Sequence, residues 1–532
     1  MRSTSSILAV SFALACASTH GTPVFAQSEV RAGCGLEQRL APWRATCHSP
    51  FHFAGPVPAV PESSPTRLSR AATLSVFGRS AFPSDRDNGS VWTGKGLSIR
   101  LSAGIGGRLG PFRYGIFPTV HWAQNVDLVV ADTAVASYSA YLYTWLGPGI
   151  DWPQRMGSDP SGRISPGQSF FEITAWAQTA LGVSTENIWW GPSKRYPMLL
   201  GATSSGFPHV YARSPTAAFG PVRTIVRVVF GRLNESEHFD EDAGNDHNLL
   251  GALRLEVELG DPPGLQVAVT SMVRQSWDPD LTFGNLLQKL VPRSTAQAGA
   301  GEGQADGIGA VTFVLPVTSL GMRLHGTWGR GDFFLDTEDI LTEPDHNQFW
   351  AVGLHQEWRG PNNGVQWALS VEHASSAASP PQFSVRSPTF STGVYRHDGN
   401  QGHTHLGQLL GASIGPGARA TYLALDRTLA NRLLGVLVER VFWDIDAYSV
   451  ALRDQFPDGQ DREWLFGGRF GTDLNIAGAP SLRLDAFGGA SMRWNRQYVR
   501  FTGDLLDYPE RETNFWLDLR LAWTPDRGEA RK

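Results

Sequence analysis

The sequence predicts an all-β fold, a transmembrane antiparallel β-barrel of about 16 to 18 strands with a short N-terminal periplasmic segment. Only 18% of the 532 residues are charged, against roughly 25% in soluble domains, and 58 residues are Gly. No run of about 18 or more apolar residues follows the N-terminus, which excludes a helical membrane protein. Instead, segments that alternate between apolar and polar residues recur from about Leu97 onward.

Residues 1–26 are predicted to be a signal peptide. Arg2 precedes an apolar stretch from Ile7 to Ala17, and Val24-Phe25-Ala26 supplies a cleavage site after Ala26. Cys16 lies in a stretch that resembles a lipoprotein cleavage site but lacks the usual branched apolar residue three positions before the Cys, so lipidation is the alternative. The chain is therefore expected to be exported.

Residues 27–92 are expected to form a small N-terminal segment and linker. After cleavage the chain would hold two cysteines, Cys34 and Cys47, and such a pair in an oxidising periplasm predicts a local disulfide. The stretch from about Pro50 to Ser90 is rich in Pro, Ser and Arg and has no clear periodicity. The barrel itself is expected over residues 93–525, followed by a C-terminal tail at 526–532.

The alternating segments have the length and composition of membrane strands. In Leu253–Leu259 the leucines and valine fall on one face, and Arg254, Glu256 and Glu258 on the other. Such segments match the roughly 9 to 11 residues that a tilted strand needs to cross a bilayer. Tryptophans often end the apolar face, as interfacial girdles require (Trp328, Trp350, Trp358, Trp494 and Trp523).

The segment Phe515–Trp523 fits the closing strand of the barrel. Alternation also occurs in half-buried soluble sheets. A secreted β-propeller or β-helix is therefore the alternative fold.

Composition and motifs exclude several kinds of function. A net charge of −5 gives no basic footprint for nucleic acid, so no nucleic-acid partner is expected. Ser413 lies in a Gly-x-Ser-x-Gly match, but Pro416-Gly417 directly afterwards disfavours the helix that this motif needs, so no catalytic residue is predicted. His397, His403 and His405 fit no zinc spacing, and no metal or cofactor is predicted.

Two segments combine aromatic, charged and amide side chains. The first runs from Ser184 to Tyr196 and the second from Tyr395 to Gly407. Aromatic faces stack on the apolar face of a pyranose, while amide, carboxylate and guanidinium groups bind its hydroxyl or acidic groups. The candidate ligand-binding residues are therefore Glu186, Asn187, Trp189, Trp190, Lys194, Arg195, His403 and His405. The alternative is that the Trp-Trp-Gly-Pro stretch plugs or braces the barrel wall.

These segments resemble the capsule-assembly (Wzi-type) family of outer-membrane proteins. The resemblance lies in Ser-Thr-Glu-Asn-Ile-Trp-Trp-Gly-Pro at 184–192, Gly-Phe-Pro at 206–208, Gly-Arg-Leu-x-Glu-Ser at 231–236 and the His- and Gly-rich region at 395–417. It covers roughly residues 93–525 and implies an outer-membrane barrel of about 18 strands that attaches capsular polysaccharide to the cell surface, as a lectin-like anchor without catalysis. The best-known members carry a helical bundle before the barrel, where this chain has its Pro-rich segment.

The predicted function is therefore a bacterial outer-membrane barrel that binds or organises surface or capsular polysaccharide, with this polysaccharide and the outer-membrane lipid as partners. A diffusion porin for small polar solutes or sugars is the alternative, because charged residues alternate onto the inner face. An outer-membrane hydrolase that uses Ser413 is a third hypothesis. Of the 45 basic residues, four are Lys and 45 − 4 = 41 are Arg. Bidentate contacts or codon bias would both produce that excess.

Overall fold

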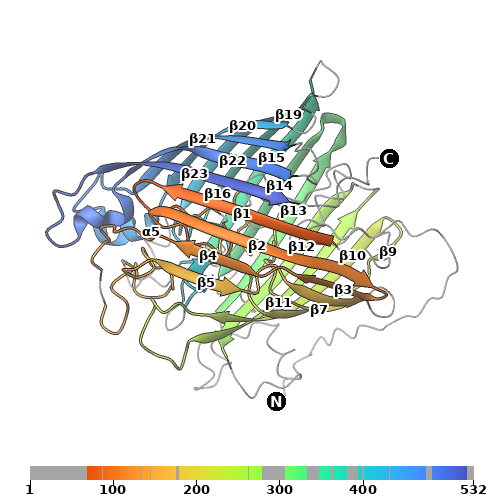
Figure 1. The fold of residues 1–532 in the computed structure, drawn as a ribbon, viewed down its shortest axis with the longest axis horizontal. Coiled ribbons are helices and arrows are strands. Elements are labelled where there is room, and N and C mark those ends of the chain that lie inside the picture. The colour runs from red at the N-terminus through yellow and green to blue at the C-terminus, as the bar shows by residue number, and fades with distance from the viewer. Residues whose placement is uncertain are drawn as a thin grey trace, which may run out of the picture.

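Antiparallel strands close into a barrel in the computed structural model (Figure 1). It describes residues 69–523, except for 278–305, 332–344, 380–392, 475–481 and the short gaps at 87, 134, 144, 175–178, 262, 346, 361–364, 398–400 and 430–431. The described residues form one 21-stranded sheet, in which three positions of the wall are each built from two consecutive strands. The wall therefore has 21 − 3 = 18 positions, which confirms the predicted fold class.

Fifteen strands are uninterrupted: β1 (Ser69–Arg79), β2 (Gly96–Leu109), β7 (Ala180–Ser184), β10 (Val222–Asn234), β11 (His247–Leu259), β12 (Leu265–Ser276), β13 (Asp306–Val317), β14 (Met322–Gly331), β15 (Gln348–Arg359), β16 (Val365–Ser375), β19 (Arg419–Leu429), β20 (Arg432–Phe442), β21 (Arg462–Leu474), β22 (Leu482–Trp494) and β23 (Arg511–Trp523). The interrupted positions are β3 (Phe112–Ile116) with β4 (Thr119–Ala123), β5 (Ser161–Ser165) with β6 (Phe170–Thr174), and β8 (His209–Arg213) with β9 (Ala217–Phe219).

Short elements lie outside this wall. They are strands β17 (Thr404–His405) and β18 (Gln408–Leu409) and the helices η2 (Thr318–Leu320), α5 (Ile445–Ala447), η3 (Tyr448–Leu452) and η4 (Arg496–Phe501). None of the helices in the described part of the chain is long and apolar enough to cross a membrane.

The barrel closes where β1 pairs with β23, with Val76 opposite Leu519, while the other edge of β1 pairs with β2. The predicted closing strand Phe515–Trp523 is therefore confirmed. The predicted boundary at residue 93 is wrong, because β1 lies within the segment 27–92 that was assigned to the linker. The Pro, Ser and Arg content of that segment obscured a strand that its partners define. The signal peptide, Cys16, the Cys34–Cys47 disulfide and the tail at 526–532 fall outside the described residues.

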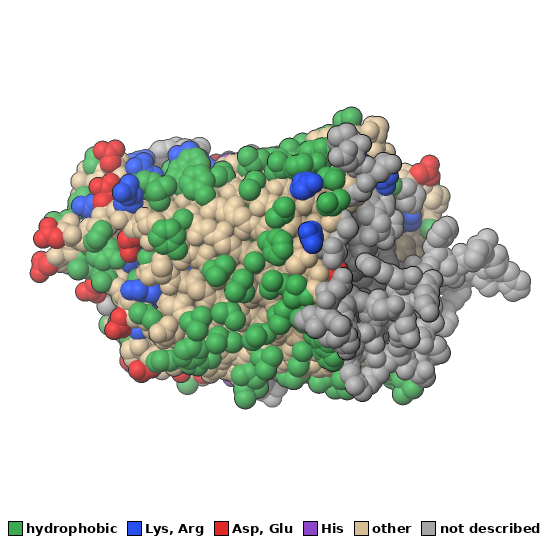
Figure 2. All heavy atoms as spheres, turned by 45° about the horizontal axis from the view of Figure 1, so that its top comes forward, with side chains coloured by type: hydrophobic (Ala, Val, Ile, Leu, Met, Phe, Trp, Pro, Cys, Tyr) green, Lys and Arg blue, Asp and Glu red, His purple; other side chains and the backbone are tan. Residues whose placement is uncertain are grey.

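The outer wall is apolar and the inner wall is polar, as the alternation predicts. On β2, Leu101 is 50% exposed, whereas its neighbour Arg100 is 3% exposed. Figure 2 shows hydrophobic side chains spread over the outer wall, with charged side chains mainly toward the ends. Apolar side chains on the outside are stable only where lipid covers them, because their exposure to water is unfavourable.

Ion pairs between Arg and carboxylates fill much of the inner face. Arg79 binds Asp518 at 2.5 Å, Arg113 binds Glu172 at 2.8 Å, and Arg493 donates to both carboxylate oxygens of Asp461. A planar guanidinium matches a carboxylate in two parallel hydrogen bonds, which an ammonium group cannot do. These pairs give the excess of Arg over Lys a structural role.

Connections of unequal length separate the two ends of the barrel. At one end the strands are joined by short turns, at 110–111, 220–221, 260–264 and 318–321. At the other end the connections are long, at 80–95, 124–160, 185–208, 235–246, 376–418, 443–461 and 495–510. Short turns of outer-membrane barrels are periplasmic and long loops are extracellular. The long-loop end, which carries α5 in Figure 1, is therefore the extracellular end.

Candidate ligand-binding cavity

Two of the extracellular connections fold into the barrel and meet there. We call their residues 185–208 and 393–418, without 398–400, the inward plug. The two parts are joined by hydrogen bonds: the backbone N–H of Gly201 donates to the carbonyl of Leu410 at 2.7 Å, and Thr203 Oγ1 donates to the carbonyl of Gly411 at 3.0 Å. The structure thus brings together the two segments that the sequence singled out.

Trp190 lies in the hydrophobic core of the inward plug. It is 3% exposed and belongs to a buried cluster that contains Tyr196 and Leu199 of the plug and Ala252 of the barrel wall. Its backbone N–H donates to the carbonyl of Leu200 at 3.0 Å, and the guanidinium of Arg254 lies 5.9 Å from its ring. Trp189 is half-buried. The Trp-Trp stretch therefore anchors the plug to the wall.

Lys194 and Arg195 hold the plug against carboxylates of the wall. The backbone N–H groups of Lys194, Arg195 and Tyr196 donate to Glu372 at 2.6, 3.0 and 3.2 Å. The Arg195 guanidinium binds Glu439 at 2.9 Å and donates to the Ser413 hydroxyl at 3.1 Å.

Ser413 therefore contacts a permanent cation, which cannot act as a general base. This contact weakens the hydrolase hypothesis, because a serine nucleophile needs a base within hydrogen-bond reach.

Asn187 and Glu186 support the start of the plug. The Asn187 amide donates to the carbonyls of Gly201 and Ser204 at 3.2 and 2.9 Å, and Gln168 donates to Asn187 Oδ1 at 2.7 Å. Glu186 Oε2 accepts a hydrogen bond from the Ser184 hydroxyl at 3.3 Å. These contacts satisfy the amide of Asn187 within the protein.

The two candidate histidines are buried and neutral. His403 Nε2 donates to the carbonyl of Leu199, 2.6 Å away, and its ring stacks on Tyr395. His405 Nδ1 accepts a hydrogen bond from the backbone N–H of Asn234 at 3.0 Å. Burial lowers the pKa of both rings to about 3, with a further contribution from Arg163 for His405 and from Arg274 for His403. Neither ring carries the positive charge that would attract an acidic sugar at neutral pH.

A polar cavity of about 440 Å³ lies between the plug and the wall formed by β2, β4 and β5. Of the eight predicted ligand residues, only His405 lines it. Its other chemically informative lining residues were not predicted from the sequence. They are Trp92, Arg100, His121, Arg163, Gln168 and His238. Trp92 is the last residue of the predicted linker, and Arg100 lies in an alternating segment, so neither carried a motif.

Several polar groups of this cavity have no partner in the described part of the chain. The guanidinium of Arg163 makes no hydrogen bond or ion pair there, and the register of Arg163 opposite His121 directs its side chain to the inner face. Four buried atoms of the lining are likewise unsatisfied by described residues, namely Arg100 Nε, His121 Nδ1, Ser165 Oγ and Asn234 Oδ1. Because buried polar atoms are normally hydrogen-bonded, this lining has spare capacity for a polar ligand.

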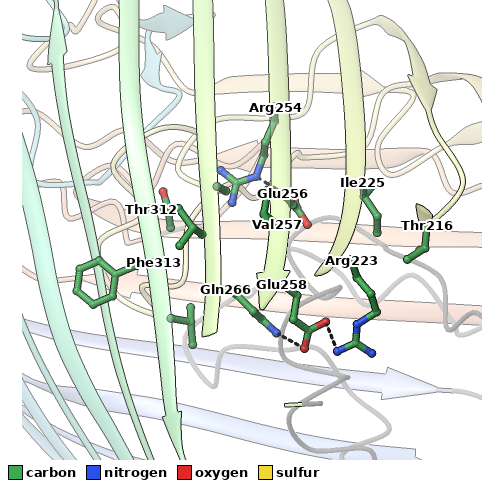
Figure 3. Close-up of a pocket in the computed structure, with 13 residues that line it drawn as sticks. Thr216, Arg223, Ile225, Arg254, Glu256, Val257, Glu258, Gln266, Thr312 and Phe313 are labelled. Atoms are coloured by element: carbon green, nitrogen blue, oxygen red, sulfur yellow. Dashed lines mark hydrogen bonds and ion pairs between the residues drawn. The ribbon is translucent and has the colours of Figure 1, made fainter. Parts of the chain in front are cut away.

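A second polar region of the lumen is closed by its own side chains. On the inner face of β10, β11 and β12, Arg223 binds Glu258 at 2.9 Å, Gln266 donates to Glu258, and Arg254 binds Glu256 at 2.9 Å (Figure 3). We call these five residues the charge ladder. The cavity beside it measures about 20 Å³. Such a space holds little more than one water molecule, so the ladder is structural.

Comparison with known proteins adds information about the fold. No family model matches the sequence, and no curated protein matches it. The structure is similar to that of Wzi of Escherichia coli, with a TM-score of 0.51 and 10% identity. The match covers 85% of this chain and 83% of that chain. Wzi is described as an outer-membrane protein involved in group 1 capsule assembly and as a carbohydrate-binding β-barrel.

Outer-membrane porins also match, at lower similarity. OccK7 of Pseudomonas aeruginosa has a TM-score of 0.38 and 9% identity, with 86% of this chain and 98% of that chain covered. A BenF-like porin from Pseudomonas fluorescens has a TM-score of 0.40 and 12% identity, with the same coverage. These two scores are too low to support an argument. The chain is an outer-membrane β-barrel, and its fold is similar to that of the capsule-assembly protein Wzi.

Proposed function

We propose that this barrel binds a surface polysaccharide with acidic sugars, as a lectin-like anchor without catalysis. The observation that carries the proposal is the polar cavity, in which Arg163, whose guanidinium has no partner in the described part of the chain, lies with Trp92 and Arg100. An indole ring stacks on the apolar face of a pyranose, and guanidinium groups pair with its carboxylate. The amides of Gln168 and Gln408 in the same lining add donors and acceptors for hydroxyl groups.

The position of the cavity supports the same function. It lies toward the extracellular end, below the long loops, and the exposed Arg163 and Glu237 in its lining connect it with solvent. The predicted residues Trp190, Lys194 and Arg195 then act indirectly, because they hold the plug that forms one side of the cavity. The described capsule role and carbohydrate binding of Wzi are consistent with this proposal.

A diffusion porin is the second candidate, favoured by the polar inner face. The inward plug and the ion pairs of the inner wall occupy much of the lumen within the described residues. Planar-bilayer recording separates the two candidates. A steady large conductance would support a pore, whereas an anchor filled by the plug is expected to stay silent.

A glycan array tests the proposal directly. The purified wild-type protein is compared with Arg163→Gln and with Arg223→Gln, which removes a paired cation of the charge ladder. We expect acidic glycans to bind, with a loss of about tenfold or more in Arg163→Gln, because a hydrogen bond to a charged group contributes roughly 1.5–3 kcal/mol. Equal binding by Arg163→Gln and the wild type would contradict the proposed site.

A further inference from the structure

In the part of the chain that the structure describes, the barrel wall is incomplete next to the candidate cavity. β5 pairs with β4 alone among the described strands, so no described strand covers its other edge. Toward the periplasmic end the wall is continuous, because β6 pairs with β7, β7 with β8, and β8 with β10. Above that level, residues 185–208 leave the wall between Ser184 and His209 and enter the inward plug. Within the described residues, two strands are therefore missing between β5 and the upper part of β10.

The missing strands leave a window in the wall. Neighbouring strands are about 4.8 Å apart, so three spacings separate β5 from β10 by roughly 14 Å. The lower border is formed by the paired ends of β7 and β8, where Ser184 lies opposite His209. The upper border is formed by two connected loops, in which the backbone N–H of Ser139 donates to the carbonyl of Phe239 at 2.9 Å.

The polar cavity reaches this window. Its lining includes Ile164 of β5, which is 77% exposed, more than any other large apolar side chain of the described residues. Pro166, Thr185 and Pro208 line both this cavity and a groove of about 770 Å³. The groove therefore begins where the cavity ends.

The groove lies on the lipid-facing side of the wall and is lined mainly by apolar side chains. Phe171, Val183 and Val210 contribute to it and are each about half exposed, as lipid-facing residues of this barrel are. At its border the guanidinium of Arg232 lies 5.6 Å from the ring of Trp277. A tryptophan with an adjacent cation is typical of the boundary between hydrocarbon and headgroups. The window opens in the extracellular half of the wall, which faces the outer leaflet.

We propose that the barrel takes an anionic glycolipid of the outer leaflet sideways through this window. Its saccharide lies in the polar cavity near Arg163, and its hydrocarbon chain stays outside in the groove along Phe171, Val183 and Val210. This inference rests on the proposed function, because it assigns the same kind of saccharide ligand and adds that this saccharide is attached to a lipid. The polar cavity and the apolar groove are joined at the three residues that line both. A glycolipid fits this arrangement because its polar saccharide is joined to an apolar chain.

Photo-crosslinking tests the inference with a defined probe. The probe is an alkyl β-D-glucuronide with a twelve-carbon chain that ends in a diazirine, added to the full-length protein in phosphatidylcholine nanodiscs. Mass spectrometry then maps the labelled residues. We expect labels on 171–174, 180–184 and 208–211 to exceed those on the remote strand β20 by about tenfold, and excess sodium glucuronate to reduce them, because head and chain bind as one ligand.

Variants separate the chain site from the saccharide site. Val210→Trp fills the groove and is expected to remove its labelling while glucuronate binding stays unchanged. Val436→Trp places the same side chain on β20, where Val436 is 62% exposed, and should alter neither readout. A folded barrel resists dodecyl sulfate at room temperature, so a heat-dependent gel shift confirms that both variants fold.

Each outcome decides between the two proposals. Uniform labelling of the wall, or labelling that glucuronate does not compete, overturns the lateral window but leaves saccharide binding intact. Failure of both the glucuronide and acidic oligosaccharides to bind overturns the proposed function as well. Protection of the β5 edge by a bound peptide strand instead of a lipid would also overturn the inference.

Discussion

The charge ladder and the candidate cavity are two polar regions of one lumen with opposite properties. In the ladder, Arg223 and Arg254 are each paired with a glutamate, and the space beside them is about 20 Å³. In the cavity, Arg163 has no partner among the described residues, and the space is about 440 Å³. An inward arginine therefore indicates a ligand site only where the fold leaves its charge uncompensated.

The largest effect is expected from breaking the ion pairs that hold the inward plug. Glu439 binds Arg86 at 2.6 Å and Arg195 at 2.9 Å, and it is almost completely buried. Glu439→Ala would leave both cations buried without this partner, which typically destabilises a protein by about 3–5 kcal/mol. We expect the heat-dependent gel shift to occur at a lower temperature. Asp454→Ala, on an exposed loop, is the control, and equal shifts in both variants would show that Glu439 does not hold the plug.

Substitutions of two tryptophans should separate an effect on the stability of the fold from an effect on ligand binding. Trp190→Ala removes a buried ring and should destabilise the fold by about 3–5 kcal/mol. Trp92→Ala removes a half-buried ring of the cavity, and about tenfold weaker binding of acidic oligosaccharide is expected with little change in stability. The measurements are thermal unfolding and oligosaccharide titration of the folded protein. If Trp190→Ala abolishes binding while the fold is intact, the motif itself contacts the ligand.

Replacing the two kinds of arginine sharpens the contrast. Arg163→Gln should weaken binding of acidic saccharide by about tenfold and leave unfolding unchanged, because Arg163 makes no ion pair with a described residue. Arg223→Gln should leave binding unchanged and lower stability slightly, because its partly exposed pair with Glu258 contributes only about 1 kcal/mol or less. A titration with increasing salt checks the charge dependence. Equal behaviour of the two variants would remove the distinction between cavity and ladder.

The most local effect is expected from Glu235, in the loop above the window. Burial, followed by the charges of Asp240, Asp151 and Asp246, raises its pKa from 4.5 to about 9. A carboxyl with a raised pKa in the folded state stabilises the fold while protonated, and that stability is lost as the pH rises from about 4.5 to about 9. The hydrogen-exchange protection factors of residues 234–248, which are corrected for the faster intrinsic exchange at high pH, should therefore be lower at pH 9 than at pH 6. Glu235→Gln should reduce this change, and an unaltered pH dependence in that variant would refute the assignment.

The sequence predicted the barrel well because alternation is a local property. In a strand such as β11, apolar and polar residues alternate, so a few residues reveal which face is outer and which is inner. The alternation recurs around the wall because the outer face contacts lipid and the inner face carries ion pairs. β1 was not predicted, because its alternation is weak and its surroundings are rich in Pro. Its pairing with β23 identifies it as a strand of the wall. The motifs at 184–196 and 395–407 were correctly singled out as unusual, but within the described residues most of them form a plug.

The cavity could not be predicted because its lining comes from distant parts of the chain. Trp92, Arg163 and His405 are separated by long stretches of sequence, and nothing in the local pattern of Arg163 distinguishes it from Arg223. The period of the strands, the apolar outer face and the unusual motifs could be predicted from the sequence, since they depend on neighbouring residues. The pairing of the inward charges, the points where the chain leaves the wall and the position of the cavity are defined by the folded structure, because they depend on contacts between distant residues.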